Sequence, residues 1–215
     1  MKAIACTLGM MLAVATWTVP ATALDITFDS VDGTGNPIVA TLEAGGYRFT
    51  ADSLQVIGVP GGTYVSNGSV YIARTAATSG GITLVRADGT PFALYEFDAA
   101  GPFASPSGAA NAQRVDLLGA QSGGGTLSAS YDLSGLSGFG HFGLPASWNN
   151  LTSATFAGIS SDAAPAALAL DDVGVGLGPN ASVAEPTSLL LALSTAVGMG
   201  AVLRHRRIRR PARRP

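Results

Sequence analysis

Cysteine is nearly absent from this chain of 215 residues, in which Cys6 is the only one. A single cysteine cannot form an intramolecular disulfide, and its place near the N-terminus excludes thiolate catalysis and cysteine metal sites from the rest of the chain. Histidine is almost as scarce, because His141 is the only one between residues 24 and 185. No spacing of serine and aspartate around it supports a catalytic triad. If strand alternation buries Phe142, His141 points to the surface.

Charged residues make up only 12% of the chain, and they are unevenly distributed. Between Leu24 and Glu185 there are four arginines and 14 carboxylates, so this region has a formal charge of 4 − 14 = −10, although the whole chain sums to −2. Such an excess of negative charge opposes binding to nucleic acid and to anionic lipid. The run Gly123–Gly125 is followed by neither a lysine nor a helical pattern, and therefore does not predict a phosphate-binding loop.

The N-terminus has the three parts of a secretory signal peptide. Lys2 supplies the positive charge, residues 3–19 are mostly apolar, and Ala21-Thr22-Ala23 has the Ala-x-Ala form of a cleavage site. We therefore expect residues 1–23 to be removed on export, so that the mature chain begins at Leu24.

The C-terminal part contains a stretch that can cross a membrane. Residues 188–203 carry no charge, which corresponds to roughly 24 Å of helix, and Thr187 and snorkelling arginines make it just long enough to span a bilayer. The sequence thus predicts a transmembrane helix over residues 187–203 and a basic tail over 204–215. A positive cluster beside an apolar segment stays in the cytoplasm, which places the body outside. The arginines closest to the helix are Arg204, Arg206, Arg207, Arg209 and Arg210.

A short motif, Ala184-Glu185-Pro186-Thr187-Ser188, comes at the start of this apolar stretch. A Glu-Pro motif, a marginal apolar helix and a basic tail, in this order, resemble the PEP-CTERM sorting signal of Gram-negative bacteria. The resemblance implies cleavage near the motif by an exosortase, a membrane-embedded, cysteine transpeptidase-like enzyme. It also implies a precursor anchored in the inner membrane and a product at the cell surface or in the extracellular matrix. Ala184 stands where the family usually has proline, and the alternative is an ordinary C-terminal anchor without sorting.

The region between the two terminal segments has short apolar runs separated by glycine-rich turns, and no helical period before Thr187. This pattern predicts an all-β fold over residues 24–175, an antiparallel two-sheet sandwich or jelly roll, followed by a flexible tether over 176–186. A poorly folded, low-complexity matrix protein is the alternative. The expected strands cover 24–29, 47–51, 54–59, 69–73, 81–85, 92–97, 113–118, 125–131, 138–144, 151–156 and 167–175.

The first and last expected strands carry acidic residues, Asp29 in the one and Asp171-Asp172 in the other. Together with the Gly-Gly hairpin and the Leu-Pro strand end between them, they give a layout similar to the galactose-binding-type jelly roll of carbohydrate-binding modules. The resemblance implies that the two strands lie together and that Asp29, with one or both of Asp171 and Asp172, holds a structural calcium ion, for which carboxylate oxygens are suitable ligands. The alternative is that a buried aspartate is satisfied by backbone amides. No other cofactor is expected.

Glycan binding requires an aromatic ring and polar groups near the surface. Trp148-Asn149-Asn150 lies in an expected edge loop, where the ring could stack on a sugar while the two amides donate hydrogen bonds. Tyr64 in Gly61-Gly62-Thr63-Tyr64 is a second candidate of the same kind. The alternative for Trp148 is a tryptophan folded over the end of the core.

Together these patterns predict an exported, exosortase-sorted surface or biofilm-matrix protein that is not an enzyme, with exopolysaccharide as the candidate partner of its body. Glu96 and Asp98 support one enzymatic alternative, because they lie two positions apart on one strand and could act as acid and base in glycoside hydrolysis. That hypothesis requires both carboxylates to face a shared cleft. The other interpretation of this pair is a solvated strand end.

Overall fold

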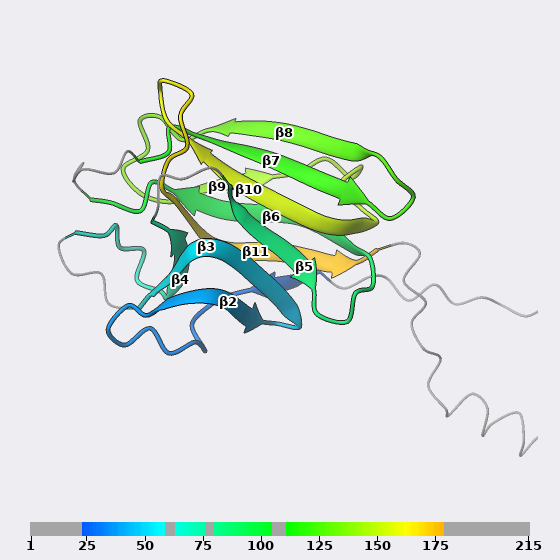
Figure 1. The fold of residues 1–215 in the computed structure, drawn as a ribbon, viewed down its shortest axis with the longest axis horizontal. Coiled ribbons are helices and arrows are strands. Elements are labelled where there is room, and N and C mark those ends of the chain that lie inside the picture. Colours follow the sequence, from blue (N-terminus) through cyan, green and yellow to red (C-terminus); the bar gives the residue numbers. More distant parts are fainter. Residues whose placement is uncertain (1–22, 59–62, 76–79, 105–110, 179–215) are drawn as a thin grey trace, which may run out of the picture. The chain divides into compact units, whose positions relative to one another are not determined.

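The computed structural model describes residues 23–58, 63–75, 80–104 and 111–178, and all of them belong to one compact unit that ends at Pro179. The predicted signal peptide, sorting motif, transmembrane helix and arginine tail lie outside these residues. In the described part the regular structure is entirely β (Figure 1), and no helix there is long and apolar enough to cross a membrane. The strands are β1 (Leu24–Ile26), β2 (Ile38–Ala44), β3 (Tyr47–Ile57), β4 (Tyr71–Arg74), β5 (Ile82–Arg86), β6 (Phe92–Ala100), β7 (Arg114–Gln121), β8 (Thr126–Asp132), β9 (Gly140–Gly143), β10 (Leu151–Ile159) and β11 (Leu168–Leu177).

The strands form one hydrogen-bonded series, β8-β7-β10-β5-β3-β4-β11-β6-β9, which is folded into two layers (Figure 1). The long strand β3 connects the layers: Tyr47–Thr50 pairs with β5 in one layer, and Leu54–Ile57 pairs with β4 in the other. β2 adds to β3, and β1 adds to β11. All these strand pairs are antiparallel. The predicted antiparallel β-sandwich is therefore the fold of the described residues.

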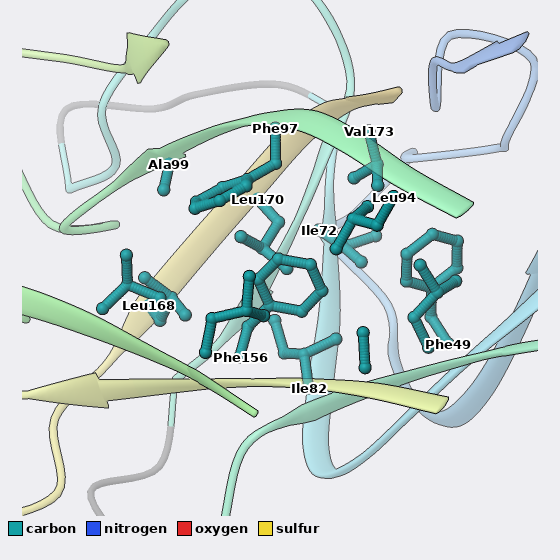
Figure 2. Packing of buried hydrophobic residues seen from close by; sticks show 14 of the residues in the cluster. Phe49, Ile72, Ile82, Leu94, Phe97, Ala99, Phe156, Leu168, Leu170 and Val173 are labelled. Atoms are coloured by element: carbon teal, nitrogen blue, oxygen red, sulfur yellow. The ribbon is translucent and has the colours of Figure 1, made fainter. Parts of the chain in front are cut away.

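The core lies between the two layers and is made by the inward-facing half of each strand. Figure 2 shows Phe97 and Leu94 of β6 on one side, with Phe156 of β10 and Ile82 of β5 on the other. All four are fully buried, and the rings of Phe97 and Phe156 meet edge to face with centroids 5.2 Å apart. Along β8 and β10, side chains that face the core alternate with polar side chains that face the surface. This alternation matches the period of two in the sequence.

The first and last strands lie together as the sequence predicts. Leu24 pairs with Val175 and Ile26 with Val173, so residue 24 and the end of β11 meet at the same end of the sandwich. The register of β11 against β6 shifts between Asp171 and Gly174, and Asp172 in this bulge has a φ of 42°. A bulge in a strand changes the direction of the side chains that follow it.

Some strand bounds differ from the prediction: β1 ends at Ile26, so that Asp29 follows the strand, and β11 continues to Leu177 into the expected tether. Two larger features also differ. The expected strands over 47–51 and 54–59 are one continuous strand, β3, because the polar pair Asp52-Ser53 falls at the bend between the layers and not at a turn. β2 was not predicted. Its sequence, Ile38-Val-Ala-Thr-Leu-Glu-Ala44, has weak alternation, and all its side chains are exposed or partly exposed. Pairing with β3 holds this strand in place, together with the partly buried side chains of Val39, Leu42 and Ala44, which pack on the core.

Candidate functional site

The basic residues of the described part are neutralised locally. Each arginine forms an ion pair with a carboxylate on its own strand, on a neighbouring strand or in the adjoining turn, at N–O distances of 2.6–3.0 Å. Because the arginines are all paired, the other carboxylates of the described part have no arginine partner. Most of these carboxylates lie on β6, on β11 and beside β1. The four pairs are Arg48–Glu43, Arg74–Asp52, Arg86–Asp88 and Arg114–Asp116.

His141 lies among acidic side chains on the outer surface of β6 and β9. The register pairs Asp98 with His141, and Nδ1 of the imidazole lies 2.8 Å from Oδ1 of Asp98. Its Nε2 lies 3.5 Å from Oε2 of Glu96. The hydrogen bond with Asp98 raises the pKa of His141, and the nearby charges of Glu96 and Asp172 act in the same direction. The prediction that His141 points to the surface is confirmed, because 61% of its side chain is exposed while Phe142 packs on the core.

Glu96 and Asp98 are thus brought together by one histidine. Both are partly exposed, at 43% and 24% of their side chains, and neither lines the two cavities found at the ends of the sandwich. Glycoside hydrolysis needs two carboxyl groups on opposite sides of a bound sugar. Here, both side chains instead contact the same imidazole on an outer surface of the described sheet, an arrangement that differs from the one that hydrolysis needs.

Asp171 is the one buried carboxylate among the described residues, with 1% exposure. Its Oδ2 accepts hydrogen bonds from Nδ2 of Asn67 at 2.5 Å and from Oγ of Ser69 at 2.6 Å, while Oδ1 accepts one from the backbone N–H of Asp172. Burial raises the pKa of Asp171 against the opposing effect of these donors. The sequence did not identify Asn67 or Ser69 as its partners, because they lie about a hundred positions away and carry only the turn signal Asn67-Gly68.

The segment from Asn67 to Val70 also reaches Asp29, whose Oδ1 accepts a hydrogen bond from the backbone N–H of Val70. Asp29 and Asp171 are near enough to influence each other electrostatically, and Asp172 is influenced by both. The predicted calcium ligands therefore belong to one region. Among the described residues, however, no three acidic, histidine or cysteine side chains are arranged to hold a metal ion. Asp171 is satisfied by protein donors, including the one backbone amide that the alternative hypothesis expected.

Trp148 is part of the core and not a surface platform. It is 3% exposed, and a Cβ on Gly119 of β7 would lie 2.8 Å from its Cζ3 atom and 3.0 Å from Cδ2 of Leu151. The ring therefore requires glycine at position 119. The backbone carbonyl of Trp148 accepts a hydrogen bond from the N–H of Leu94. Trp148 cannot stack on a glycan in this conformation, and the alternative of a tryptophan folded over the core end is the correct one.

The other predicted glycan contacts do not form a common surface with Trp148. Asn149 donates a hydrogen bond to the carbonyl of Ala146 within its own turn. Asn150 adopts a φ of 57°, and its Oδ1 is buried without a partner among the described residues. Tyr64 lies beyond the other end of β6, where its ring stacks on Phe103 at 5.8 Å and its hydroxyl donates to Gln55. These residues shape loops at two different ends of the sandwich.

Comparison with known proteins gives only distant similarities. No protein-family model matches the chain, and no curated protein matches it. Among solved structures, a family 29 carbohydrate-binding module aligns with 80% of this chain and 95% of its own, at 14% identity and a TM-score of 0.37. The tandem CBM22 domain from Paenibacillus barcinonensis aligns with 72% of this chain and 45% of its own, at 16% identity and a TM-score of 0.39.

A third solved structure, the CBM22 and GH10 modules of a Clostridium thermocellum xylanase with xylohexaose, aligns with 78% of this chain and 30% of its own, at 14% identity and a TM-score of 0.35. At these identities and scores the likenesses assign neither a ligand nor a role to any residue of this chain.

Proposed function

We propose that this chain is an exported surface or matrix protein, sorted by an exosortase through its C-terminal tail, whose β-sandwich is a structural or glycan-binding component of the envelope or biofilm. The observation that carries the sorting proposal is the order of Glu185-Pro186, the uncharged stretch over 188–203 and the arginine cluster from Arg204 onward. A signal peptide over residues 1–23 would supply the matching export step.

A neutral, hydroxylated polymer is the partner that the surface of the sandwich favours. Thr41, Thr50, Thr83 and Thr155 are paired in register across β2, β3, β5 and β10, and the hydroxyls of Thr83 and Thr155 lie 3.1 Å apart. Each hydroxyl can both donate and accept a hydrogen bond. Because the nearby Arg48–Glu43 pair is internally neutral, a polysaccharide can approach this row without leaving an unpaired charge.

The sorting proposal is tested in cells with and without an active exosortase. Mass spectrometry of the mature protein should show loss of the residues that follow Pro186 only when the enzyme is present. Changing Glu185 and Pro186 together to Ala should leave the protein anchored and uncleaved. A wild-type protein that keeps its arginine tail in the presence of the enzyme would instead identify an ordinary membrane anchor.

The glycan proposal is tested by a pull-down with the exopolysaccharide of the producing cell. Retention of the body on this polymer, but not on a charged control resin, supports a glycan-binding component. Absence of retention supports a passive coat protein. Hydrolysis of the polymer, with loss of the activity in Glu96→Gln, would overturn the non-enzymatic assignment.

A further inference from the structure

The end of the sandwich where β1 begins and β11 ends contains a cavity of about 450 Å³. Its walls come from the β2–β3 turn, the turn after β5 and the terminal residues of β1 and β11. This volume lies within the range of about 300–1,000 Å³ that is usual for small-molecule sites. The lining side chains that matter for recognition are Leu24, Tyr47, Arg86, Asp88 and Leu177.

Tyr47 lines this cavity. The residue is 4% exposed, and its ring packs edge-on against Phe92 with centroids 5.5 Å apart. Arg86 and Asp88 line the same cavity as Tyr47, and burial raises the pKa of the Tyr47 phenol, an effect that the charge of Arg86 opposes. No residue of the described part forms a hydrogen bond with it. A hydroxyl without a protein partner can donate a hydrogen bond to solvent or to a ligand and can accept one from it.

The charged groups of the cavity neutralise each other. Nη2 of Arg86 lies 3.0 Å from Oδ2 of Asp88, while Oδ1 of Asp88 accepts hydrogen bonds from the N–H and hydroxyl of Thr90. A guanidinium group has five N–H donors in a fixed plane, so this pair leaves donors of Arg86 for a ligand. The site therefore offers directed hydrogen bonds without a net charge.

The remaining wall is backbone and apolar surface. Gly45 and Gly46 have φ values of 58° and 81°, and a Cβ at Gly46 would meet no atom within 4 Å, so the turn leaves open space there. A Cβ on Gly176, which lines the cavity, would lie 2.8 Å from the hydroxyl of Tyr95, so this second phenol packs next to Gly176. Leu24, 47% exposed, adds apolar surface at the rim.

A sugar ring has the same combination of properties, with apolar C–H faces and a rim of hydroxyl groups. An anionic ligand fits less well, because Arg86 is already paired and the body carries a formal charge of −10. We propose that the cavity bounded by Tyr47, Arg86 and Asp88 binds one or two units of a neutral saccharide. This inference rests on the proposed glycan-binding role and assigns it a site that Trp148 and Tyr64 do not provide.

The test uses protein purified after export from cells that produce the full chain. Binding of neutral glucose, galactose, xylose and mannose disaccharides is measured by calorimetry, with a glucuronic acid disaccharide as the anionic comparison. Tyr47→Phe removes only the hydroxyl and should weaken binding about three- to tenfold, which corresponds to one neutral hydrogen bond. Ala87→Trp places a large ring at an exposed position of the cavity wall and should abolish binding. The matched control, Arg114→Gln, breaks an arginine–aspartate pair that does not line the cavity and should bind as the wild type does.

The possible outcomes distinguish failure of this cavity as the binding site from failure of the glycan-binding role. Weaker binding by both cavity variants, with unchanged melting temperatures and shifts of the Gly45 and Gly46 amide signals in the wild type, supports the proposal. Equal binding by the wild type, Tyr47→Phe and Ala87→Trp overturns this site but leaves glycan binding in place. Preference for the glucuronic acid disaccharide overturns the neutral ligand class. A wild-type protein that binds no saccharide at millimolar concentration overturns both the site and the glycan-binding role, whereas processing of the tail still tests sorting separately.

Discussion

Replacement of Trp148 by Ala separates a core role of this residue from a ligand-binding role. A buried aromatic side chain removes about 150–250 Å² from water, which at about 25 cal/mol per Å² corresponds to about 4–6 kcal/mol. Because Trp148 is 3% exposed and packs beside Gly119 and Leu151, the fold removes nearly all of this area from water, and the Ala variant loses this burial. Measured losses for such substitutions are about 3–5 kcal/mol. The free energy of unfolding of a domain is about 5–15 kcal/mol, so Trp148→Ala should leave the body marginally stable.

The assay is urea denaturation followed by circular dichroism, since Trp148 is the only tryptophan of the described residues and its fluorescence is lost in the variant. The midpoint should fall, while the slope of the free energy with urea stays that of the wild type. In the wild type, Trp148 emission should be blue-shifted and should not respond to saccharides, because the ring is away from solvent.

Gly119→Ala provides the matched control for this contact. The added Cβ lies 2.8 Å from the indole, and overpacking of this kind costs about 1–3 kcal/mol. In a Trp148→Leu background the same substitution should cost much less, so the two changes should not be additive. A Trp148→Ala protein that unfolds within about 0.5 kcal/mol of the wild type, or additive effects of the pair, would refute the placement of the indole on β7.

Three further predictions concern charge and topology. Asp98 raises the pKa of His141, so the stabilisation from this contact is present below about pH 6.5 and is lost as pH rises through the folded-state pKa. An NMR titration of His141 should therefore show a lower pKa in Asp98→Asn than in the wild type. An unchanged pKa would contradict the contact. If Asp29, Asp171 and Asp172 hold calcium, the protein should melt several degrees higher with calcium than with chelator, and Asp172→Asn should reduce the difference; equal melting temperatures would count against an ion. A reporter fused after Pro215 should be active only in the cytoplasm, and periplasmic activity would contradict the predicted orientation.

The fold was largely predictable because most strands of this protein alternate clearly and are bounded by glycine. β8 and β10 are examples, in which every second side chain faces the core. β2 was not predictable in this way, since its core-facing residues Val39, Leu42 and Ala44 are only partly buried and do not follow a regular alternation. The bend of β3 was missed for a related reason: Asp52-Ser53 looks like a turn in the sequence, but in the fold it is where one strand passes between two layers.

The site was predicted less well, because an aromatic residue in a loop does not reveal which way it faces. Trp148 looks like a binding platform beside two asparagines, yet Gly119, 29 positions earlier in the chain, leaves the space that takes the ring into the core. Tyr47, in contrast, begins a strand and looks like an ordinary core residue. Its unpartnered hydroxyl becomes evident only when the turn after β5 brings Arg86 and Asp88 beside it.

The partners of the charged residues also lie at very different distances along the sequence, and only the near ones could be predicted. Arg86–Asp88 and Arg114–Asp116 are two positions apart, a spacing that places both side chains on one face of a strand or in one turn. Asp98 and Asp171 meet their partners 43 and 104 positions away. Two of the four arginines therefore pair within their own strand or turn, whereas Asp98 and Asp171 depend on a histidine, an asparagine and a serine from distant parts of the chain. Protons and cations should consequently act on the surface formed by β6, β9 and β11, while the neutral cavity at Tyr47 should respond to neither.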